Sequence, residues 1–213
     1  IEMAKGKDAK PHIGIFGRRN HGKSSIINVL SGQEVAIVSE VAGTTTDPVK
    51  KSMEIPGIGP VILIDTAGID DIGELGAKRI EKTLQALKTV DAAILVIAEN
   101  LFGDEELRLI EEFRNLDVPF FIIHNKTDIQ PLSEQTKQKI AQIVDVPVIS
   151  FSAKQPHELE TLIKTLREII PPSAYQSKSL IGDLICHGDT DVTKIVNLMK
   201  NEKGIDVKIR DMK

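Results

Sequence analysis

The chain has 213 residues, which suits one domain and a short remainder too small for a second core. Its net charge of −4 and pI near 5.8 argue against a broad basic face, so we do not expect a nucleic-acid partner. A single cysteine, Cys186, excludes an intrachain disulfide, and no apolar run approaches the roughly 18 residues of a membrane span. We therefore expect a soluble, cytoplasmic protein with no membrane contact. Because the chain begins with Ile, we expect it to be a segment of a longer protein.

Apolar runs rich in Val and Ile predict buried parallel strands at 13–16, 61–64, 92–98, 118–123 and 146–151. Apolar residues at helical spacing predict helices after residue 24 and within 80–87, 107–113 and 159–170. The run 51–55 and the Pro56-Gly57 turn predict a hairpin, which adds an antiparallel edge strand. This order predicts an α/β fold with a mostly parallel six-stranded sheet.

The most informative segment is GRRNHGKS, from Gly17 to Ser24, between the first predicted strand and a helix. Its GxxxxGKS spacing predicts a phosphate-binding loop, because the glycines let backbone amides turn inward at a helix N-terminus. Lys23 is predicted to reach the terminal phosphates, and Ser24 is predicted to bind Mg²⁺. The alternative is a plain strand-to-helix turn with a glycine at each end, which does not explain the Lys-Ser pair after Gly22.

A second motif, DTAG, follows the predicted strand at 61–64. Asp65 stands at the carboxyl end of this strand, where open α/β sheets collect ligands, and is predicted to hold Mg²⁺ through water. The backbone amide of Gly68 is predicted to contact a γ-phosphate, so that hydrolysis would release the loop that follows. The alternative is an Asp that only caps a turn.

A third motif, NKTD at 125–128, predicts selectivity for guanine. The carboxylate of Asp128 can accept hydrogen bonds from the guanine N1 proton and exocyclic amine, whereas adenine presents an acceptor at N1. A solvated polar turn is the alternative. Ser152-Ala153-Lys154, after the last predicted strand, is predicted to place backbone amides near the guanine oxygen.

A long polar connection from Ser31 to Lys50 contains the run Val41 to Asp47, VAGTTTD. Connections of this length are usually functional or disordered. A threonine hydroxyl here would complete magnesium coordination only when the γ-phosphate is present. The alternative is a threonine-rich surface loop.

Together, GRRNHGKSS, GTTTD, DTAG, NKTD and SAK resemble the five G motifs of the TrmE-Era-EngA group of small GTPases, from Pro11 to about Ile170. The resemblance implies the three-layer sandwich fold of P-loop NTPases, with a G domain at 11–172 after a flexible segment at 1–10. It also implies a GTPase that uses GTP, GDP, Mg²⁺ and K⁺. It implies Thr45 as the switch-I magnesium ligand, beside Ser24 and Asp65, and Asn20 as the potassium ligand. The implied catalytic residues are Asn20, Lys23, Thr45 and Gly68. The implied nucleotide-binding residues are Asn20, His21, Gly22, Lys23, Ser24, Ser25, Thr44, Thr45, Asp65, Gly68, Asn125, Lys126, Asp128, Ser152, Ala153 and Lys154.

Hydrolysis in this chain cannot use the glutamine that Ras-type GTPases carry after DTAG, because Ile69 stands there. Nothing in the sequence directs Arg18 or Arg19 toward a γ-phosphate, so we expect both to be solvated or at an interface. We instead expect potassium-stimulated hydrolysis, in which a cation held by Asn20 stabilises charge on the leaving group. The alternative for Asn20 is a plain turn residue.

Acidic residues after DTAG, at 70, 71 and 74, are candidates to orient the attacking water, although acidic residues also favour the first turn of a helix. Two histidines lie inside or beside motifs. We expect His21 and His124 to serve shape and packing, because neither belongs to a metal-ligand cluster.

Closer still, the double arginine at 18–19 and the runs GTTTDPV and DDIGELG resemble the HydF family of [FeFe]-hydrogenase maturation GTPases. That resemblance implies a slow switch in H-cluster maturation, a homodimer, and two kinds of partner: radical-SAM maturation enzymes and apo-[FeFe] hydrogenase. It also implies an iron-sulfur cluster, but Cys186-His187 offers at most one ligand pair, so the cluster ligands are not in this chain.

Apolar spacing in the segment 173–213 predicts a helix-strand tail, which would pack on the G domain or on a second copy. Its run SLIGDLICHGDT resembles the opening of the HydF dimerisation region, so the resemblance implies that the tail starts a dimerisation domain. The main alternative function is a ribosome- or tRNA-modification-associated GTPase of the same group. A third is a dimerisation module with a vestigial nucleotide site.

Overall fold

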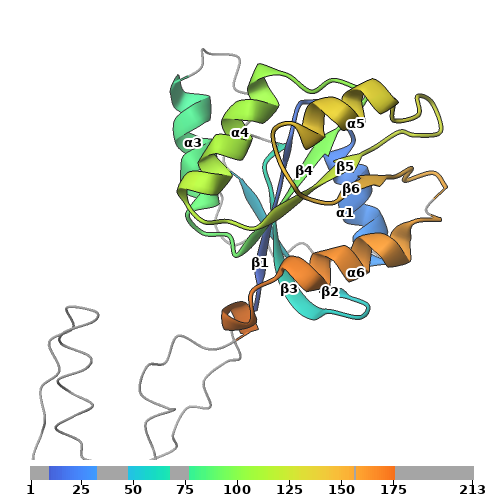
Figure 1. The fold of residues 1–213 in the computed structure, drawn as a ribbon. Helices are drawn as coiled ribbons and strands as arrows, with labels where there is room; N and C mark the ends of the chain where they lie inside the picture. Colours follow the sequence, from blue (N-terminus) through green and yellow to red (C-terminus); the bar gives the residue numbers. More distant parts are fainter. Residues whose placement is uncertain (1–9, 33–47, 68–76, 156, 176–213) are drawn as a thin grey trace, which may run out of the picture. The chain divides into compact units, whose positions relative to one another are not determined.

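A computed structural model describes residues 10–32, 48–67, 77–155 and 157–175 of the chain, all within one compact unit at 7–177. Its centre is a six-stranded sheet in the order β2-β3-β1-β4-β5-β6 (Figure 1). The strands are β1 (His12–Gly17), β2 (Val49–Ile55), β3 (Gly59–Asp65), β4 (Ala92–Ile97), β5 (Phe120–His124) and β6 (Val148–Ser150). β2 pairs antiparallel with β3, and every other pair is parallel. The predicted fold class is confirmed.

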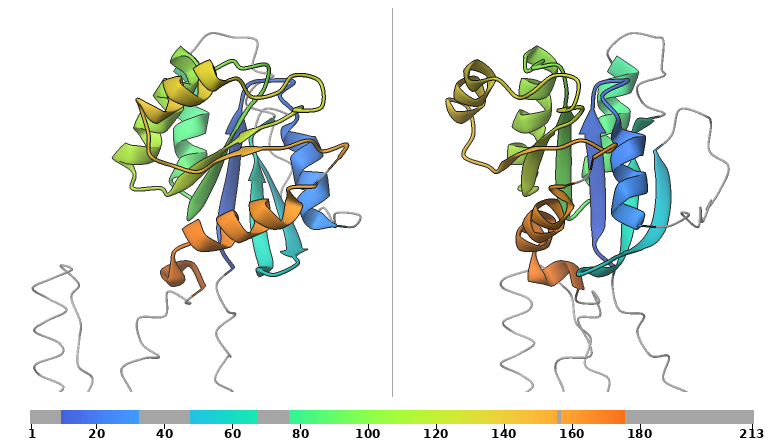
Figure 2. Two further views of the ribbon diagram at one scale, coloured as in Figure 1. Left: turned by 45° about the vertical axis from the view of Figure 1, so that its right-hand side comes forward. Right: turned by 90° about the vertical axis from the view of Figure 1, so that its right-hand side faces the viewer.

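Helices cover both faces of this sheet (Figure 2). They are α1 (Lys23–Ser31), α3 (Ala77–Leu87), α4 (Asp104–Asn115), α5 (Glu134–Ala141) and α6 (Leu159–Ile169), followed by a short 3-10 helix, η1 (Pro172–Tyr175). Side chains of α1 and α6 pack in one buried cluster, and those of α3, α4 and α5 pack in a second cluster on the opposite face. The molecule therefore has the three predicted layers.

The central strand β4 shows why the apolar runs are continuous. Ile94 and Val96 point into the cluster beneath α1 and α6, whereas Leu95 and Ile97 point into the cluster beneath α3, α4 and α5. All four side chains are fully buried. A parallel strand covered on both faces needs apolar side chains at every position, so its sequence lacks the polar alternation of a half-exposed strand.

The sequence did not predict α5, and the structure shows why. Only Thr136 and Ile140 are buried in this short helix, so its apolar signal at helical spacing is weak. The helix instead begins with a cap, because Ser133 Oγ accepts a hydrogen bond from the Thr136 amide at 3.2 Å.

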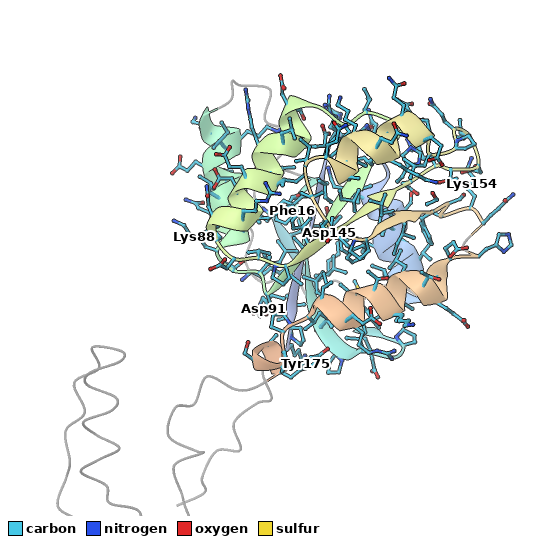
Figure 3. The ribbon with its side chains drawn as sticks, viewed as in Figure 1. Phe16, Lys88, Asp91, Asp145, Lys154 and Tyr175 are labelled. Atoms are coloured by element: carbon cyan, nitrogen blue, oxygen red, sulfur yellow. The ribbon has the colours of Figure 1, made fainter. Side chains whose placement is uncertain are left out.

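The two ends of the sheet differ in character. At the amino end, the carboxylate of Asp91 accepts a hydrogen bond from the His12 amide at 2.8 Å and ties the start of β4 to β1. Figure 3 shows Asp91 and Tyr175 at this end and Lys154 at the other end, where the predicted motifs gather. The fold thus presents these motifs at the carboxyl end of the parallel strands, as expected for a ligand site.

The predicted domain boundaries stay predictions. Ala174 in η1 is buried in the cluster beneath α1 and α6, so packing against the sheet continues past residue 172. The rest of the predicted tail, at 176–213, and most of the predicted N-terminal segment, at 1–9, lie outside the described residues. Within the described part of the chain, no helix is both long and apolar enough to cross a bilayer.

Candidate guanine-nucleotide site

The loop from Gly17 to Lys23 joins β1 to α1, and its two glycines are required by close contacts. Gly17 has a φ of +148°, and a Cβ at this position would lie 2.3 Å from the Val96 carbonyl oxygen. Gly22 has a φ of +88°, and a Cβ at this position would lie 2.2 Å from Asn125 Nδ2. Any side chain at either position would therefore push the loop away from β4 or from the NKTD motif.

The start of α1 is prepared to receive an anion. No side chain caps this helix, and its first turn has no acidic residue. Lys23 is buried, and its Nζ donates hydrogen bonds to the carbonyls of Gly17 at 2.6 Å and Arg18 at 3.2 Å. Ser24 and Ser25 are exposed in the same turn. A first turn without a side-chain cap, a nearby ammonium group and exposed hydroxyls form the chemistry of a phosphate site.

The NKTD motif, at the end of β5, is bonded directly to this loop. Asn125 Nδ2 donates to the His21 carbonyl at 2.9 Å, and Lys126 Nζ donates to the Asn20 carbonyl. Lys126 adopts a left-handed backbone with φ of 57°, which turns the chain back toward the loop. Two motifs separated by about a hundred residues thus form one continuous surface.

The SAK motif completes the same end of the sheet. Ser152 Oγ donates to Asp128 Oδ1 at 2.8 Å, and the Thr127 amide donates to the Phe151 carbonyl at 3.1 Å. Asp128 is exposed, while Asn125 is buried and its Oδ1 has no hydrogen-bond partner in the described structure. These contacts fix the Asp128 carboxylate and leave it open to solvent, where a ligand can reach it.

Asp65 ends β3, where it pairs with Ile15 of β1. Its Oδ1 accepts a hydrogen bond from the Ala67 amide at 3.0 Å, and its Oδ2 lies 3.3 Å from Lys51 Nζ. Thr66 Oγ1 donates to the Ile15 carbonyl at 2.6 Å, which fastens the end of β3 to β1. The predicted site residues Thr44, Thr45 and Gly68 lie outside the described residues, as do the water-orienting candidates at 70, 71 and 74.

Both histidines near the motifs are buried. Burial lowers the pKa of His21, although the Glu106 carboxylate acts in the opposite direction. Burial, and then the neighbouring His21, lower the pKa of His124. The Asn100 amide donates to His124 Nε2 at 3.3 Å, and neither Nδ1 has a partner in the described structure. Both rings are therefore neutral at neutral pH. The described residues contain no group of three His, Cys, Asp or Glu side chains that could hold a metal.

Arg18 departs from its predicted role. Its Nε and Nη2 donate to the two carboxylate oxygens of Glu106 at 2.7 and 2.9 Å, and Glu106 is 1% exposed. This pairing raises the pKa of Arg18. Burial acts to raise the pKa of Glu106, but the hydrogen bonds from Arg18 and the Gly103 amide outweigh it and hold the pKa below its ordinary value. Arg18 is thus fixed on α4 rather than solvated, while Arg19 is exposed.

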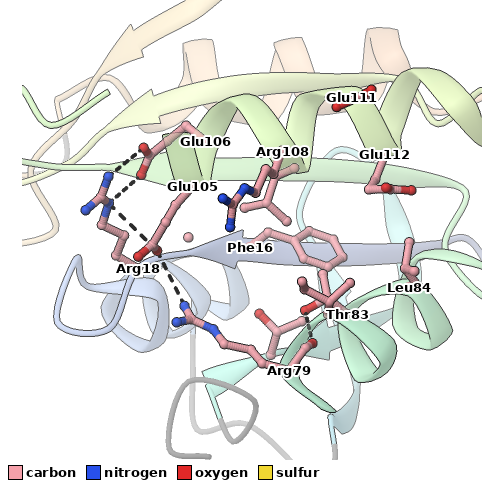
Figure 4. Close-up of a pocket in the computed structure, with 14 residues that line it drawn as sticks. Phe16, Arg18, Arg79, Thr83, Leu84, Glu105, Glu106, Arg108, Glu111 and Glu112 are labelled. Carbon is pink, nitrogen blue, oxygen red and sulfur yellow. Dashed lines mark hydrogen bonds and ion pairs between the residues drawn. The ribbon is translucent and has the colours of Figure 1, made fainter. Parts of the chain in front are cut away.

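A cavity of about 270 Å³ lies between α3 and α4, beside Arg18 (Figure 4). Phe16, Ile80 and Leu84 form much of its apolar lining. At one end, Arg79 of α3 lies 3.5 Å from Glu105 of α4. Among the residues described around it, none belongs to the predicted nucleotide-binding set. The cavity and the Arg18–Glu106 pair were missed from the sequence, because Glu106 carries no local motif and is 88 residues from Arg18.

Comparison with known proteins decides the family. Residues 12–126 match the 50S ribosome-binding GTPase family. The chain belongs to this family. As a P-loop GTPase of the TrmE-Era-EngA type, it binds guanine nucleotide and hydrolyses GTP. Its similarity to solved structures supports the same fold: a crystal structure of a variant of Aquifex aeolicus Era bound to GDP and AlF4⁻ superposes with a TM-score of 0.58 at 26% identity, over 76% of this chain and 57% of that one.

Two curated relatives show how this GTPase compares with longer proteins. GTPase Der of Wolinella succinogenes is 31% identical over 178 residues, which are 79% of this chain and 38% of that protein. The tRNA modification GTPase MnmE of Lachnoclostridium phytofermentans is 35% identical over 156 residues, which are 73% of this chain and 33% of that protein. The matched part of this chain therefore spans only about a third of the length of these relatives.

Proposed function

We propose that this GTPase is a slow, nucleotide-controlled switch whose GTP-bound and GDP-bound forms bind a partner with different affinities. The observation that carries the proposal is the junction of Asn125 and Lys126 with the phosphate loop, through the carbonyls of His21 and Asn20. A nucleotide held at its base by Asp128 and at its phosphates by Lys23 would rest on one fixed surface. Chemistry at the γ-phosphate would then change the segments around Thr45 and Gly68, whose contacts stay predictions.

The magnesium ligands proposed for this switch suit the ion. Ser24 and Asp65 offer a hydroxyl and a carboxylate, which are the hard oxygen donors that Mg²⁺ prefers. Asp65 Oδ2 already attracts a cationic group in the fold, because Lys51 Nζ lies 3.3 Å away. Bound between Ser24, a water on Asp65 and the phosphates, Mg²⁺ would neutralise the charge of the β- and γ-phosphates.

We propose that K⁺ supplies the remaining positive charge at the phosphates, with Asn20 as its protein ligand. Asn20 is exposed and adopts a left-handed backbone with φ of 64°. Arg18 is a poor candidate for an internal arginine finger, because Glu106 of α4 accepts hydrogen bonds from both Nε and Nη2 of its guanidinium group. A fixed cation near the leaving group would stabilise charge that develops there.

The cellular process served by the switch has two candidates. The names of the MnmE relatives point to tRNA modification, and one solved Era complex contains a 16S ribosomal RNA segment, which favours an RNA-associated role. The double arginine, GTTTDPV and DDIGELG favour the HydF-like role in [FeFe]-hydrogenase maturation, with a homodimer, radical-SAM enzymes and apo-hydrogenase as partners. Salt-dependent RNA binding by the purified protein would support the first role, and nucleotide-dependent binding of the maturation enzymes would support the second.

Replacing the base-recognition carboxylate tests the nucleotide site itself. Asp128→Asn should weaken guanine nucleotides and favour xanthine nucleotides, because an amide can donate to the oxygen that xanthine carries in place of the exocyclic amine. We expect the preference between GDP and XDP, measured by competition against a fluorescent nucleotide, to shift by at least about tenfold. Asp145→Asn makes the same change at an exposed carboxylate outside the predicted site, so this control should keep the wild-type preference for the base. An unchanged preference in the Asp128 variant would contradict the assignment.

A further inference from the structure

Lys51 is a charged residue that the predicted site does not include, yet it contacts a predicted magnesium ligand. Its Nζ lies 3.3 Å from Asp65 Oδ2, and the two side chains are only 18% and 8% exposed. The other oxygen of Asp65 accepts the Ala67 amide at 3.0 Å. The carboxylate is therefore held between a backbone amide and an ammonium group, in a place where water is largely excluded.

The register of the β2–β3 hairpin explains how Lys51 reaches this point. Val49 pairs with Asp65, and Lys51 pairs with Leu63 on the antiparallel ladder. Lys51 shares its face of β2 with Met53, which is buried beneath α1 and α6. The long side chain of Lys51 can therefore run back along this face to the carboxyl end of β3. Lys50, on the opposite face, is exposed.

We infer that Lys51 competes with hydrated Mg²⁺ for the Asp65 carboxylate and so sets how firmly the metal and its nucleotide are retained. The inference rests on the magnesium-dependent nucleotide site proposed above. An ammonium group and a divalent cation that share one carboxylate repel each other, so the ammonium must withdraw when the metal's water shell engages Asp65. Coupling between two binding events is reciprocal. Removing Lys51 should therefore raise the affinity for Mg²⁺ by the same factor by which the Lys51–Asp65 contact lowers it. Lys51 is thus a positioning residue that acts on the metal through Asp65.

The test is the Mg²⁺ dependence of nucleotide release. Wild type, Lys51→Met and Lys50→Met are loaded with a fluorescent GDP analogue, and the release rate is measured across a titration of free Mg²⁺. We expect the Mg²⁺ concentration at half-maximal retention to fall about fivefold in Lys51→Met, at the lower end of typical coupling because the pair is partly exposed. Lys50→Met, which removes an equal charge from the opposite face, should keep the wild-type midpoint.

A third variant separates charge from packing. Lys51→Arg keeps the cation, so its midpoint should stay within about twofold of the wild type. An unchanged or raised midpoint in Lys51→Met, or the same lowered midpoint in Lys51→Arg, would overturn the inference. These outcomes differ from a failure of the proposed nucleotide site, in which the wild type itself would bind no GDP at any Mg²⁺ concentration.

A double-mutant cycle gives a readout without nucleotide. Denaturation of wild type, Lys51→Met, Asp65→Asn and the double variant is followed in EDTA. The destabilisation caused by Lys51→Met should largely disappear in the Asp65→Asn background. In that background the partner of Lys51 is a neutral amide, so the loss of Lys51 leaves no buried charge unpaired. Additive effects of the two substitutions would contradict a direct interaction.

Discussion

The guanidinium of Arg18 and the carboxylate of Glu106 form a two-pronged ion pair, with bonds of 2.7 and 2.9 Å, that fastens the phosphate loop to the first turn of α4. The Arg18 carbonyl also accepts a hydrogen bond from Lys23 Nζ at 3.2 Å. Glu106 is itself fixed at the start of the helix, because its Oε2 accepts a hydrogen bond from the Gly103 amide at 2.8 Å. The position of Lys23, the lysine predicted to bind phosphate, thus depends on a buried carboxylate in another layer of the fold.

Removing the charge of Glu106 should loosen this attachment. We expect Glu106→Gln to lower the free energy of unfolding by about 1.5–3 kcal/mol, the range for hydrogen bonds to charged groups, and to weaken GDP binding. Glu105→Gln is the matched control, because Glu105 is 46% exposed and lies 3.9 Å from Arg18 Nε. The control should cost about 0.5 kcal/mol or less. Urea denaturation and nucleotide titration measure both quantities, and equal losses in the two variants would show that burial of Glu106 is unimportant.

Adding a methyl group at Gly22 should separate the phosphate loop from the NKTD motif. The new Cβ of Gly22→Ala would lie 2.2 Å from Asn125 Nδ2, at a φ of +88°. Gly32→Ala carries a comparable backbone cost, since its φ is +63°, but its Cβ would meet no atom of the described residues within 4 Å. We expect Gly32→Ala to lose about 1–2 kcal/mol of stability and keep GDP affinity. Gly22→Ala should lose at least about tenfold in GDP affinity, and wild-type affinity in this variant would refute the close contact.

Stability should fall as the pH drops through the histidine range. Burial lowers the folded-state pKa of both His21 and His124, so the unfolded chain takes up their protons first, near the ordinary value of about 6.5. The stability from keeping them neutral is fully present above that pH and is lost below it, by up to about 1.4 kcal/mol per pH unit for each ring.

Denaturation at pH 7.5, 6.5 and 5.5 tests this expectation, with a His21→Asn/His124→Asn double variant as the comparison. The double variant should have a flatter profile in this range. The Glu106 carboxylate, whose pKa is lowered, contributes in a separate window, because its stabilisation is present above its ordinary pKa and is lost at more acidic pH. Parallel profiles for the wild type and the double variant would mean that the histidines do not control the loss.

GTP turnover should depend on the identity of the monovalent cation. If K⁺ bound near Asn20 stabilises the transition state, replacing K⁺ by Na⁺ should slow single-turnover hydrolysis by about tenfold, or about 1.4 kcal/mol. Asn20→Gly removes the side-chain ligand and still accepts the left-handed backbone, so it should lose the difference between the two ions. Equal rates of the wild type in both salts would exclude the potassium proposal.

The sequence motifs and the apolar runs beside them predicted much of the fold and of the candidate site. The GxxxxGKS, DTAG and NKTD motifs each follow an apolar run, and parallel strands bring their carboxyl ends to one edge, so the order of the motifs already implies a shared site. The weak apolar pattern of α5 explains why that helix was missed. Only two of its side chains are buried, and its cap at Ser133 is a single-residue signal.

The amino-acid sequence by itself determined the fold class, the family motifs and the type of nucleotide, because these depend on residue types at fixed local spacing. Tertiary structure alone decided which charged groups meet: Arg18 with Glu106, and Lys51 with Asp65. Both pairs depend on contacts between separate elements, on strand register and on the reach of a long side chain. No local sequence pattern encodes such a pairing. From the sequence alone, Lys51 and Arg18 therefore cannot be distinguished from ordinary surface charges.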